Sequence, residues 1–242
     1  VSTILKGLFV TRRMTLFYLS LIMKDFSVII TAGGIGKRMG GDLPKQFIEV
    51  AGKPILLHTI SIFYKYNSGA QIIVTLPEDW KDYWNDLLKK HNFKIPHTIV
   101  SGGEERFHSI KNALEACKSP HVFVHDGVRP LVAVETLNRC SEALQFHKAV
   151  IPVVGMKESI RWVEGSQSKA LKRSEYRIVQ TPQCFERELL VQAYNQPFHE
   201  GITDDASLVE ELGQRIECVE GNDENIKVTT PTDLIIAEGL LK

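Results

Sequence analysis

The sequence predicts an α/β fold built on a largely parallel sheet, and three observations carry that prediction. From Ser27 onward, short β-branched runs alternate with longer stretches of helical period, which is the pattern of βαβ units. Polar clusters directly follow several of the apolar runs, where open α/β sheets bind their ligands. A chain of 242 residues with 43% hydrophobic content can bury a core of ordinary size. We therefore expect a single domain over residues 25–242.

The elements follow in order along the chain. The first strand candidates are SVIIT, QIIVTL, HTIVSG and HVFVHD. The helix candidates between and after them are residues 55–66, 79–91, 106–117 and 134–147. After AVIPVV, two extended segments flank a Gly-Ser turn, which predicts a projecting β-arm at about residues 154–180. Helical period returns at Glu186 and Asp204, and the strand candidates RIECVE and NIKVT precede a final helix from Pro231.

Residues 1–24 differ in character from the rest of the chain. Arg12 and Arg13 precede an apolar run of about ten residues, which resembles a signal peptide in outline but is too short to span a bilayer. No small-residue cleavage site follows it. We expect a dispensable extension or a mis-called start, with Met23 as the natural beginning; a functional targeting segment is the alternative.

Charge and cysteine content restrict the function classes. The formal net charge is zero, which argues against nucleic acid and an anionic membrane as partners and requires any anion site to be local. The four cysteines are scattered without a CxxC motif, which fits neither a zinc site nor a disulfide framework. A reducing cytoplasm is the simplest setting.

Residues 31–46, TAGGIGKRMGGDLPKQ, form the most unusual stretch, with five glycines and three cations. A dinucleotide fingerprint fails because Met39 stands where its last glycine is required, and the P-loop pattern fails as well. What remains is a loop whose bare amides can approach an anion, with Arg38 and Lys45 supplying charge. A glycine-rich turn with solvated cations explains the loop, taken alone, equally well.

Six ordered motifs carry a family resemblance. AGGIGKRMGGDLPKQF resembles the G-x-G-x-R-M…P-K-Q signature of nucleotidyltransferases that join CTP to a sugar-alcohol phosphate. GGEERFHS, HDGVRP, TPQCF, TDDAS and ENIKVTTPTDL resemble further blocks of the 2-C-methyl-D-erythritol 4-phosphate cytidylyltransferase family. The resemblance spans residues 27–241 and implies a Rossmann-like three-layer sandwich with a mostly parallel central sheet, whose projecting β-arm is used for dimerisation.

The reaction that the resemblance implies joins CTP to 2-C-methyl-D-erythritol 4-phosphate and releases pyrophosphate, a step of non-mevalonate isoprenoid precursor synthesis. Because the attacking phosphate is already an anion, the site needs no base and must instead offset repulsion between phosphates. The family's catalytic cations correspond to Arg38, Lys45 and Lys227. Mg²⁺ is expected as cofactor, bound mainly through the CTP phosphates, with Asp126 as a possible ligand.

The remaining site residues are also implied by the resemblance. The nucleotide-binding positions are Ala32, Gly33, Gly34, Gly36, Gly103, Glu104 and Ser109. The acceptor-binding positions are Asp126, Arg129, Ser159, Arg173, Thr181, Thr203 and Asp204. Arg106 fits a nucleotide role and a helix-start pairing with Glu104 or Glu105 equally well. His125 is expected to be packed rather than catalytic.

The arm is the part of the sequence that departs from the family pattern. VVGMKESIRW is longer than the usual segment, and Ser159 stands where threonine is common. An exposed hairpin would leave Trp162 and Tyr176 in water, so we expect a twofold homodimer that buries them.

Three other functions are compatible with parts of the sequence. A sister family that uses ribitol 5-phosphate shares several motifs, but HDGVRP and TDDAS favour methylerythritol phosphate. An NAD-dependent oxidoreductase is disfavoured because the fingerprint fails. A non-catalytic nucleotide-binding module is disfavoured because Arg38, Lys45 and Lys227 are all present.

Overall fold

The structure is a computed structural model that describes residues 25–33 and 43–242. The proposed extension at residues 1–24 lies outside the described residues, and so do the site residues Gly34, Gly36 and Arg38. Within the described part of the chain, no helix is both long and apolar enough to cross a membrane. All four cysteines are free thiols.

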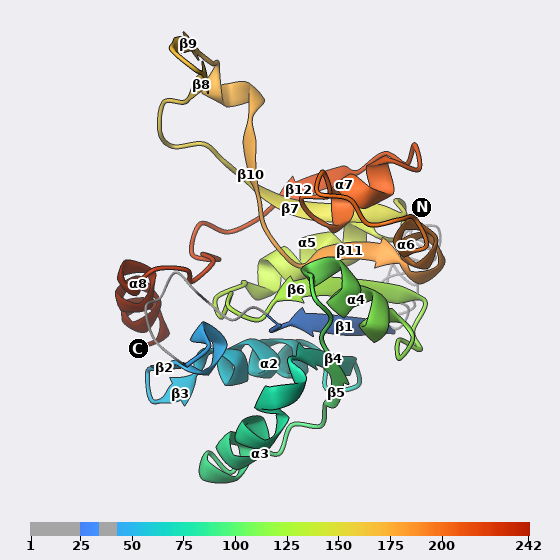
Figure 1. Ribbon diagram of the computed structural model, residues 1–242, viewed down its shortest axis with the longest axis vertical. Coiled ribbons are helices and arrows are strands. Elements are labelled where there is room, and N and C mark those ends of the chain that lie inside the picture. Colours follow the sequence, from blue (N-terminus) through green and yellow to red (C-terminus); the bar gives the residue numbers. More distant parts are fainter. Residues whose placement is uncertain (1–24, 34–42) are drawn as a thin grey trace, which may run out of the picture.

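The described chain forms one mixed, mostly parallel sheet (Figure 1). Its strands run in the order β10-β7-β11-β6-β1-β4-β5, and β12 pairs with β7. The pairs β6-β1, β1-β4, β4-β5 and β12-β7 are parallel, whereas β11 and β10 pair in the antiparallel sense. The strands are β1 (Phe26–Thr31), β4 (Gln71–Leu76), β5 (Thr98–Ser101), β6 (His121–Asp126), β7 (Ala149–Gly155), β10 (Arg177–Val179), β11 (Gln183–Glu186) and β12 (Glu217–Glu220). The predicted α/β class and its mostly parallel sheet are confirmed.

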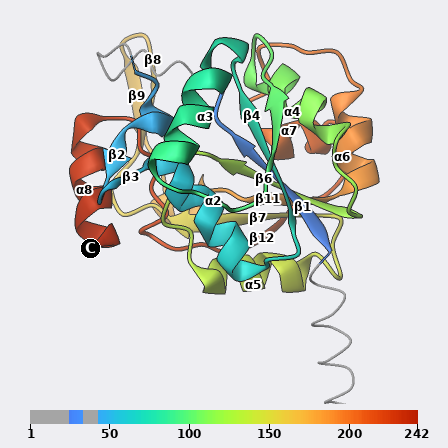
Figure 2. The same cartoon turned by 90° about the horizontal axis from the view of Figure 1, so that it is seen from below.

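Alternating side chains of β1 divide the core into two layers. Val28 and Ile30 pack on one side with residues of α2, α3 and α5, while Ile29 packs on the other with residues of α4, α6 and α7. The helices are α2 (Ile55–Tyr66), α3 (Lys81–Lys90), α4 (Arg106–Leu114), α5 (Val134–Ala143), α6 (Arg187–Tyr194), α7 (Asp205–Glu210) and α8 (Pro231–Leu241). Figure 2 shows helices on both faces of the twisted sheet, with α8 to the side of it near β2 (Glu49–Val50) and β3 (Lys53–Pro54). Helices on both faces make a three-layer arrangement.

Short elements complete the fold beside the sheet. The 3-10 turns are η2 (Lys45–Phe47), η3 (Glu78–Trp80) and η4 (Arg173–Glu175), and β2 (Glu49–Val50) pairs with β3 (Lys53–Pro54). A small third cluster joins Val50 and Ile55 to Val228 and to Ala237 of α8. Its packing fixes the chain that follows Lys227 against the rest of the domain.

The chain between β7 and β11 leaves the sheet as an arm (Figure 1). Its tip is a hairpin of β8 (Arg161–Glu164) and β9 (Gln167–Ala170), and Gly165 in the turn has a φ of +56° that favours glycine. The hairpin lies where the Gly-Ser turn predicted it. Its use in dimerisation stays a prediction.

One predicted strand is absent. NIKVT, residues 225–229, has no strand structure, although RIECVE contains β12. A backbone bond from Val228 N–H to the carbonyl of Val128 and the packing of the buried Val228 side chain hold the segment instead. An alternating apolar pattern indicates one buried face, which this segment provides without a neighbouring strand.

Candidate active site

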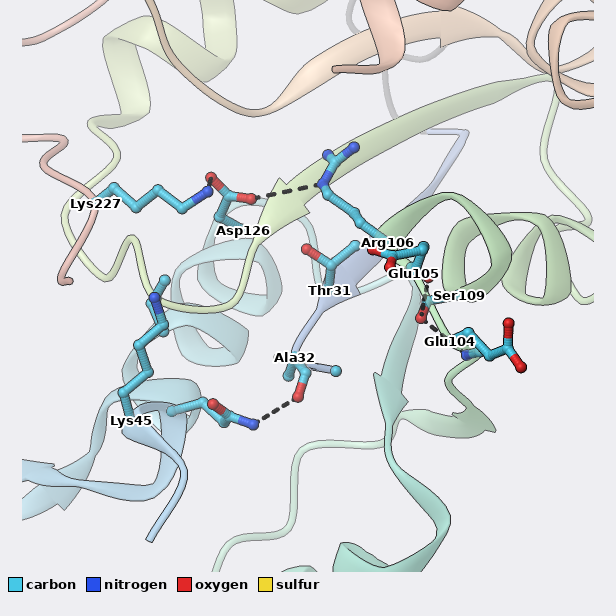
Figure 3. Close-up of a pocket in the computed structure, with 13 residues that line it drawn as sticks. Thr31, Ala32, Lys45, Glu104, Glu105, Arg106, Ser109, Asp126 and Lys227 are labelled. Carbon is cyan, nitrogen blue, oxygen red and sulfur yellow. Dashed lines mark hydrogen bonds and ion pairs between the residues drawn. The ribbon is translucent and has the colours of Figure 1, made fainter. Parts of the chain in front are cut away.

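A cavity of about 300 Å³ opens at the carboxyl ends of β1, β5 and β6 (Figure 3). Five separate segments line it: the end of β1, the η2 turn, the β5-α4 connection with the start of α4, the end of β6, and the loop before α8. Of the predicted site residues, the lining contains Ala32, Gly33, Lys45, Gly103, Glu104, Ser109, Asp126 and Lys227. The polar clusters predicted to meet at one sheet edge therefore do meet.

Gln46 links the two sides of the glycine-rich stretch. Its side chain is buried, and Nε2 donates to the Ala32 carbonyl at 2.6 Å. This bond ties the η2 turn, and with it Lys45, to the end of β1 (Figure 3). Gln46 is not among the site residues predicted from the sequence. The signal was its place in PKQF, directly after a candidate cation.

Ser109 organises the wall on the side of α4. Its Oγ accepts the amide N–H of Gly103 at 3.0 Å and donates to the carbonyl of Glu105 at 3.1 Å. Gly103 must be glycine, because a Cβ there would overlap the Cβ of His108. The β5-α4 connection is thus folded tightly over a serine whose only proton is already used.

Asp126, on the opposite wall, lies among three positively charged side chains. Its Oδ2 lies 3.0 Å from Arg129 Nε and 3.2 Å from Lys227 Nζ, and its Oδ1 lies 3.9 Å from Arg106 Nε. Burial alone would raise the pKa of Asp126, but Arg106, Lys227 and Arg129 together hold that pKa far below its usual range. Asp126 is therefore an anion that orients three cations.

Arg106 does not pair with Glu104 or Glu105, so that part of the sequence interpretation is wrong. Its guanidinium instead forms a bidentate pair with Asp205, at 2.8 and 2.6 Å. Asp205 is fully buried and also accepts the hydroxyl proton of Tyr194. A planar fork matches a carboxylate in this geometry, whereas the flexible glutamates beside it offer no buried position. The signal for Asp205 was the second aspartate of TDDAS.

His125 is packed, as expected, but it is also bonded at both ring nitrogens. It is fully buried, with Nε2 3.0 Å from the Arg129 carbonyl and Nδ1 3.0 Å from Thr181 Oγ1. Burial lowers the pKa of His125 to about 4, so the ring is neutral at pH 7. Thr181 is buried as well and does not line the cavity.

The other predicted acceptor residues lie outside this cavity. Arg129 lies behind Asp126, where its Nη1 donates to the Asn225 carbonyl at 2.7 Å. Ser159 lies on the arm, as does Arg173, which donates to the carbonyl of Lys157. Thr203 and Asp204 line an adjacent cavity of about 310 Å³ that shares Glu105 and Arg106 with the first, and Asp204 caps α7.

The comparisons with known proteins agree with one another. Residues 26–242 match the family described as 2-C-methyl-D-erythritol 4-phosphate cytidylyltransferase. A protein of that name from Bacteroides thetaiotaomicron is 53% identical over 216 residues, which cover 89% of this chain and 99% of the relative. One from Clostridium beijerinckii is 41% identical, over 89% of this chain and 98% of the relative.

Solved structures show the same likeness. The 4-diphosphocytidyl-2C-methyl-D-erythritol synthase of Anaerococcus prevotii is 30% identical with a TM-score of 0.78, over 90% of this chain and 96% of that one. The 2-C-methyl-D-erythritol 4-phosphate cytidylyltransferase of Thermus thermophilus is 32% identical with a TM-score of 0.73, over 89% and 98%.

Proposed function

Because this chain belongs to the 2-C-methyl-D-erythritol 4-phosphate cytidylyltransferase family, we propose that it transfers a cytidylyl group from CTP to 2-C-methyl-D-erythritol 4-phosphate and releases pyrophosphate. The enzyme class is that of a nucleotidyltransferase. The observation that carries the proposal is the single cavity that joins Lys45, Lys227 and Asp126 to the Ser109 wall. It offers cations on one side and a polar wall of backbone and hydroxyl groups on the other.

The cations act on the transferring phosphate. The acceptor phosphate attacks the α-phosphorus of CTP, the bond to the pyrophosphate oxygen breaks, and negative charge moves toward the leaving group. Lys227 is held 3.2 Å from Asp126 Oδ2, so it is oriented before substrate arrives. Lys45 faces the same cavity, and Arg38 would complete the set. A preorganised cation stabilises the developing charge without reorganising when the bond breaks.

The Ser109 wall supports cytosine as the base. Since Ser109 has already donated its proton to Glu105, its remaining capacity is to accept a hydrogen bond. Cytosine presents an amino donor at the position where uracil presents a carbonyl acceptor. A hydroxyl that can only accept therefore forms a hydrogen bond with the amino group of cytosine. Opposite the carbonyl of uracil it would leave two acceptors facing each other, which weakens the binding of UTP. Ala32, Gly33, Gly103 and Glu104, with Gly34 and Gly36, are the proposed backbone partners of the nucleotide.

We propose Mg²⁺ as the cofactor, held mainly through the phosphates of CTP. The described residues contain no group of three or more His, Cys, Asp or Glu side chains that could hold a metal. Among the described residues, Asp126 is the carboxylate that pairs with Lys227 in the cavity, and its Oδ1 lies 3.9 Å from Arg106 Nε. A single carboxylate plus substrate phosphates suits magnesium, which retains several waters. When bound, the ion would neutralise charge on the phosphates.

The acceptor and the dimer are proposed together. Ser159 and Arg173 lie on the arm and do not line the cavity of their own chain, so as acceptor-binding residues they would serve a partner's cavity. The arm also exposes apolar side chains that burial against a second copy would remove from water, namely Trp162, Val163, Tyr176, Ile178 and Val179. The acceptor-binding roles of Arg129, Thr203 and Asp204 stay predictions.

We also propose a cytoplasmic location, which fits the supply of CTP.

A pyrophosphate-release assay tests the function. CTP, UTP and ATP are each paired with methylerythritol phosphate and with ribitol 5-phosphate in the presence of Mg²⁺. CTP with methylerythritol phosphate should give the highest kcat/KM, and a better rate with ribitol 5-phosphate would overturn the acceptor assignment.

Lys227→Ala tests the catalytic role in the same assay. Turnover should fall on the order of a hundredfold, equivalent to about 3 kcal/mol. Lys89→Ala, which removes an exposed lysine of α3, is the matched control and should leave turnover unchanged. If Lys227→Ala kept full turnover and lost only affinity for CTP, the residue would be a nucleotide clamp rather than a catalytic group.

A further inference from the structure

Two buried side chains lie directly behind Asp126 and outside the cavity. Thr181 precedes β11, and His125 is the penultimate residue of β6. The amide N–H of Asp126 donates to Thr181 Oγ1 at 3.1 Å, and the same Oγ1 lies 3.0 Å from His125 Nδ1. The other ring nitrogen, Nε2, lies 3.0 Å from the Arg129 carbonyl. One chain of hydrogen bonds thus runs from the backbone of Asp126 through Thr181 and His125 to Arg129.

For a neutral His125 ring, the direction of every bond in this chain follows from the groups that form it. The Arg129 carbonyl can only accept, so His125 Nε2 must carry the proton. In a neutral ring Nδ1 is then an acceptor, and Thr181 must donate its single hydroxyl proton to it. The ring also packs in a T-shaped arrangement against the fully buried Phe63, at a centroid distance of 4.9 Å, which restricts its movement. Asp126 N–H supplies the bond that Thr181 accepts.

This direction decides what Thr181 can do. A phosphate oxygen needs a hydrogen-bond donor, and the only donor of Thr181 is already used inside the protein. Breaking that bond would leave His125 Nδ1 as a buried acceptor without a partner, which costs on the order of 1–3 kcal/mol. The geometry therefore disagrees with the sequence expectation that Thr181 binds the acceptor phosphate.

Resting on the proposed function, we propose that Thr181 and His125 are positioning residues that hold Asp126, and through it Lys227, in the orientation that cytidylyl transfer requires. Asp126 receives support on its backbone from Thr181 and presents Oδ2 to Lys227 at 3.2 Å. Neither Thr181 nor His125 touches substrate.

A second connection from Thr181 reaches the segment that carries Lys227. Asn225 is fully buried, and its Nδ2 donates to the Thr181 carbonyl at 2.8 Å. Arg129 Nη1 in turn donates to the Asn225 carbonyl at 2.7 Å. Thr181 is therefore bonded to the residue two positions before Lys227 as well as to Asp126. A shift of Thr181 would move the anion and its catalytic cation relative to each other.

Four single variants test the proposal in the pyrophosphate assay. Thr181→Val keeps the shape but loses the hydroxyl, and Thr181→Ser restores it. His125→Leu loses both ring bonds, and His125→Asn restores an acceptor near the position of Nδ1. We expect Thr181→Val and His125→Leu to lower kcat at least tenfold with KM for each substrate within about threefold of wild type. Thr181→Ser and His125→Asn should recover kcat to within about threefold of wild type.

The double variant Thr181→Val with His125→Leu separates one network from two independent effects. It should lose no more turnover than the worse single variant, because both changes break the same chain of bonds. Thr136→Val is the control: it removes the hydroxyl of a buried α5 threonine that bonds Asn222, and it should lower the melting temperature without lowering kcat.

Several results would overturn the proposal. A raised KM for the acceptor at unchanged kcat in Thr181→Val would make Thr181 a substrate contact. Losses at the two sites that multiply in the double variant would rule out a shared network. Failure of both conservative variants to recover kcat would reduce the pair to a packing role. All variants are compared on the substrate pair that the wild type prefers, so a different acceptor preference would refute the proposed function without changing this test.

Discussion

Ser109 and Thr181 each have one hydroxyl proton, and in both residues a protein acceptor takes it. Ser109 donates to the Glu105 carbonyl from the cavity wall, whereas Thr181 donates to His125 behind it. A hydroxyl whose proton is already donated within the protein can still accept a hydrogen bond from a ligand but cannot donate one. The direction of its hydrogen bonds, rather than its residue type, decides what each of these hydroxyls can offer a ligand.

Ser109→Ala tests the accept-only hydroxyl. The variant removes the partner proposed for the cytosine amino group, so kcat/KM for CTP should fall roughly tenfold, or about 1.4 kcal/mol, the loss of one hydrogen bond. The rate with UTP should not fall, because the wild-type hydroxyl offers uracil nothing. The CTP to UTP ratio of kcat/KM from the pyrophosphate assay measures this. Equal losses with both nucleotides would show that Ser109 only folds the β5-α4 connection.

Among single residues, the sequence predicted a cavity position best where a polar residue directly follows or ends a strand. Asp126 was placed at the sheet edge by the rule for parallel strands, and it lines the cavity. Lys227 also lines the cavity, although NIKVT, the strand expected to carry it there, is absent. Of the two interpretations left open for Arg106, the pairing with Glu104 or Glu105 is wrong. Its partner, Asp205, lies 99 positions away, and local pairing rules do not reach so far. Gln46 was missed because a buried amide looks like any surface glutamine in sequence.

Among the elements, strands and helices with a strong period were predicted most securely. The candidate SVIIT lies within β1, and the helix expected at residues 55–66 is α2. NIKVT was wrongly taken for a strand, since alternation reports only that one face is buried. Val228 does bury that face, but against α8 and Val128 rather than against a neighbouring strand. A pairing partner is a property of the whole chain and cannot be read from five residues.

The arm is the element whose function the dimer prediction concerns. Replacing residues 161–170, the β8-β9 hairpin, by a short Gly-Ser turn removes Trp162 and Val163 while leaving β10 in the central sheet. If the arm forms the dimer, wild type should have twice the mass of one chain in solution and the shortened variant should be wholly or partly monomeric, with a melting temperature close to that of the wild-type domain. Light scattering after size-exclusion chromatography measures both masses. A wild type that is monomeric, or a variant that remains fully dimeric, would contradict the prediction.

On the scale of the whole molecule, long-range polar contacts join the layers that the apolar core separates. Arg106 at the start of α4 meets Asp205 at the start of α7, and Thr181 joins β6 to the loop before α8 through Asn225. Buried polar groups are costly unless each finds its partner, so these contacts also restrict which overall packing is stable. The stability of the entire domain is thereby coupled to the protonation of residues behind its active site.

His125 makes that coupling measurable as a pH dependence of global stability. Burial lowers the pKa of His125 to about 4, although the hydrogen bond to the Arg129 carbonyl and the charge of Asp126 both act to raise it. An unfolded histidine titrates near 6.5. Between these two pKa values the histidine is protonated in the unfolded chain but neutral in the folded protein. The free energy of unfolding therefore falls as pH falls from 6.5 toward 4. The expected loss between pH 7.5 and 4.5 is on the order of 2–3 kcal/mol from this residue. The pKa of Asp126 is also lowered, but its protonation reduces the free energy of unfolding only below about pH 4, outside this window.

Urea unfolding of wild type and His125→Asn at pH 7.5 and pH 4.5 measures the effect. The contributions of the other histidines are the same in both proteins and cancel in the difference between their free energies of unfolding. Asparagine does not titrate, so the difference in free energy of unfolding between wild type and His125→Asn should become smaller or change sign at pH 4.5. If this difference stays constant, His125 is protonated in the folded state as readily as in the unfolded chain. The neutral ring with fixed hydrogen-bond directions behind Asp126 would then be wrong.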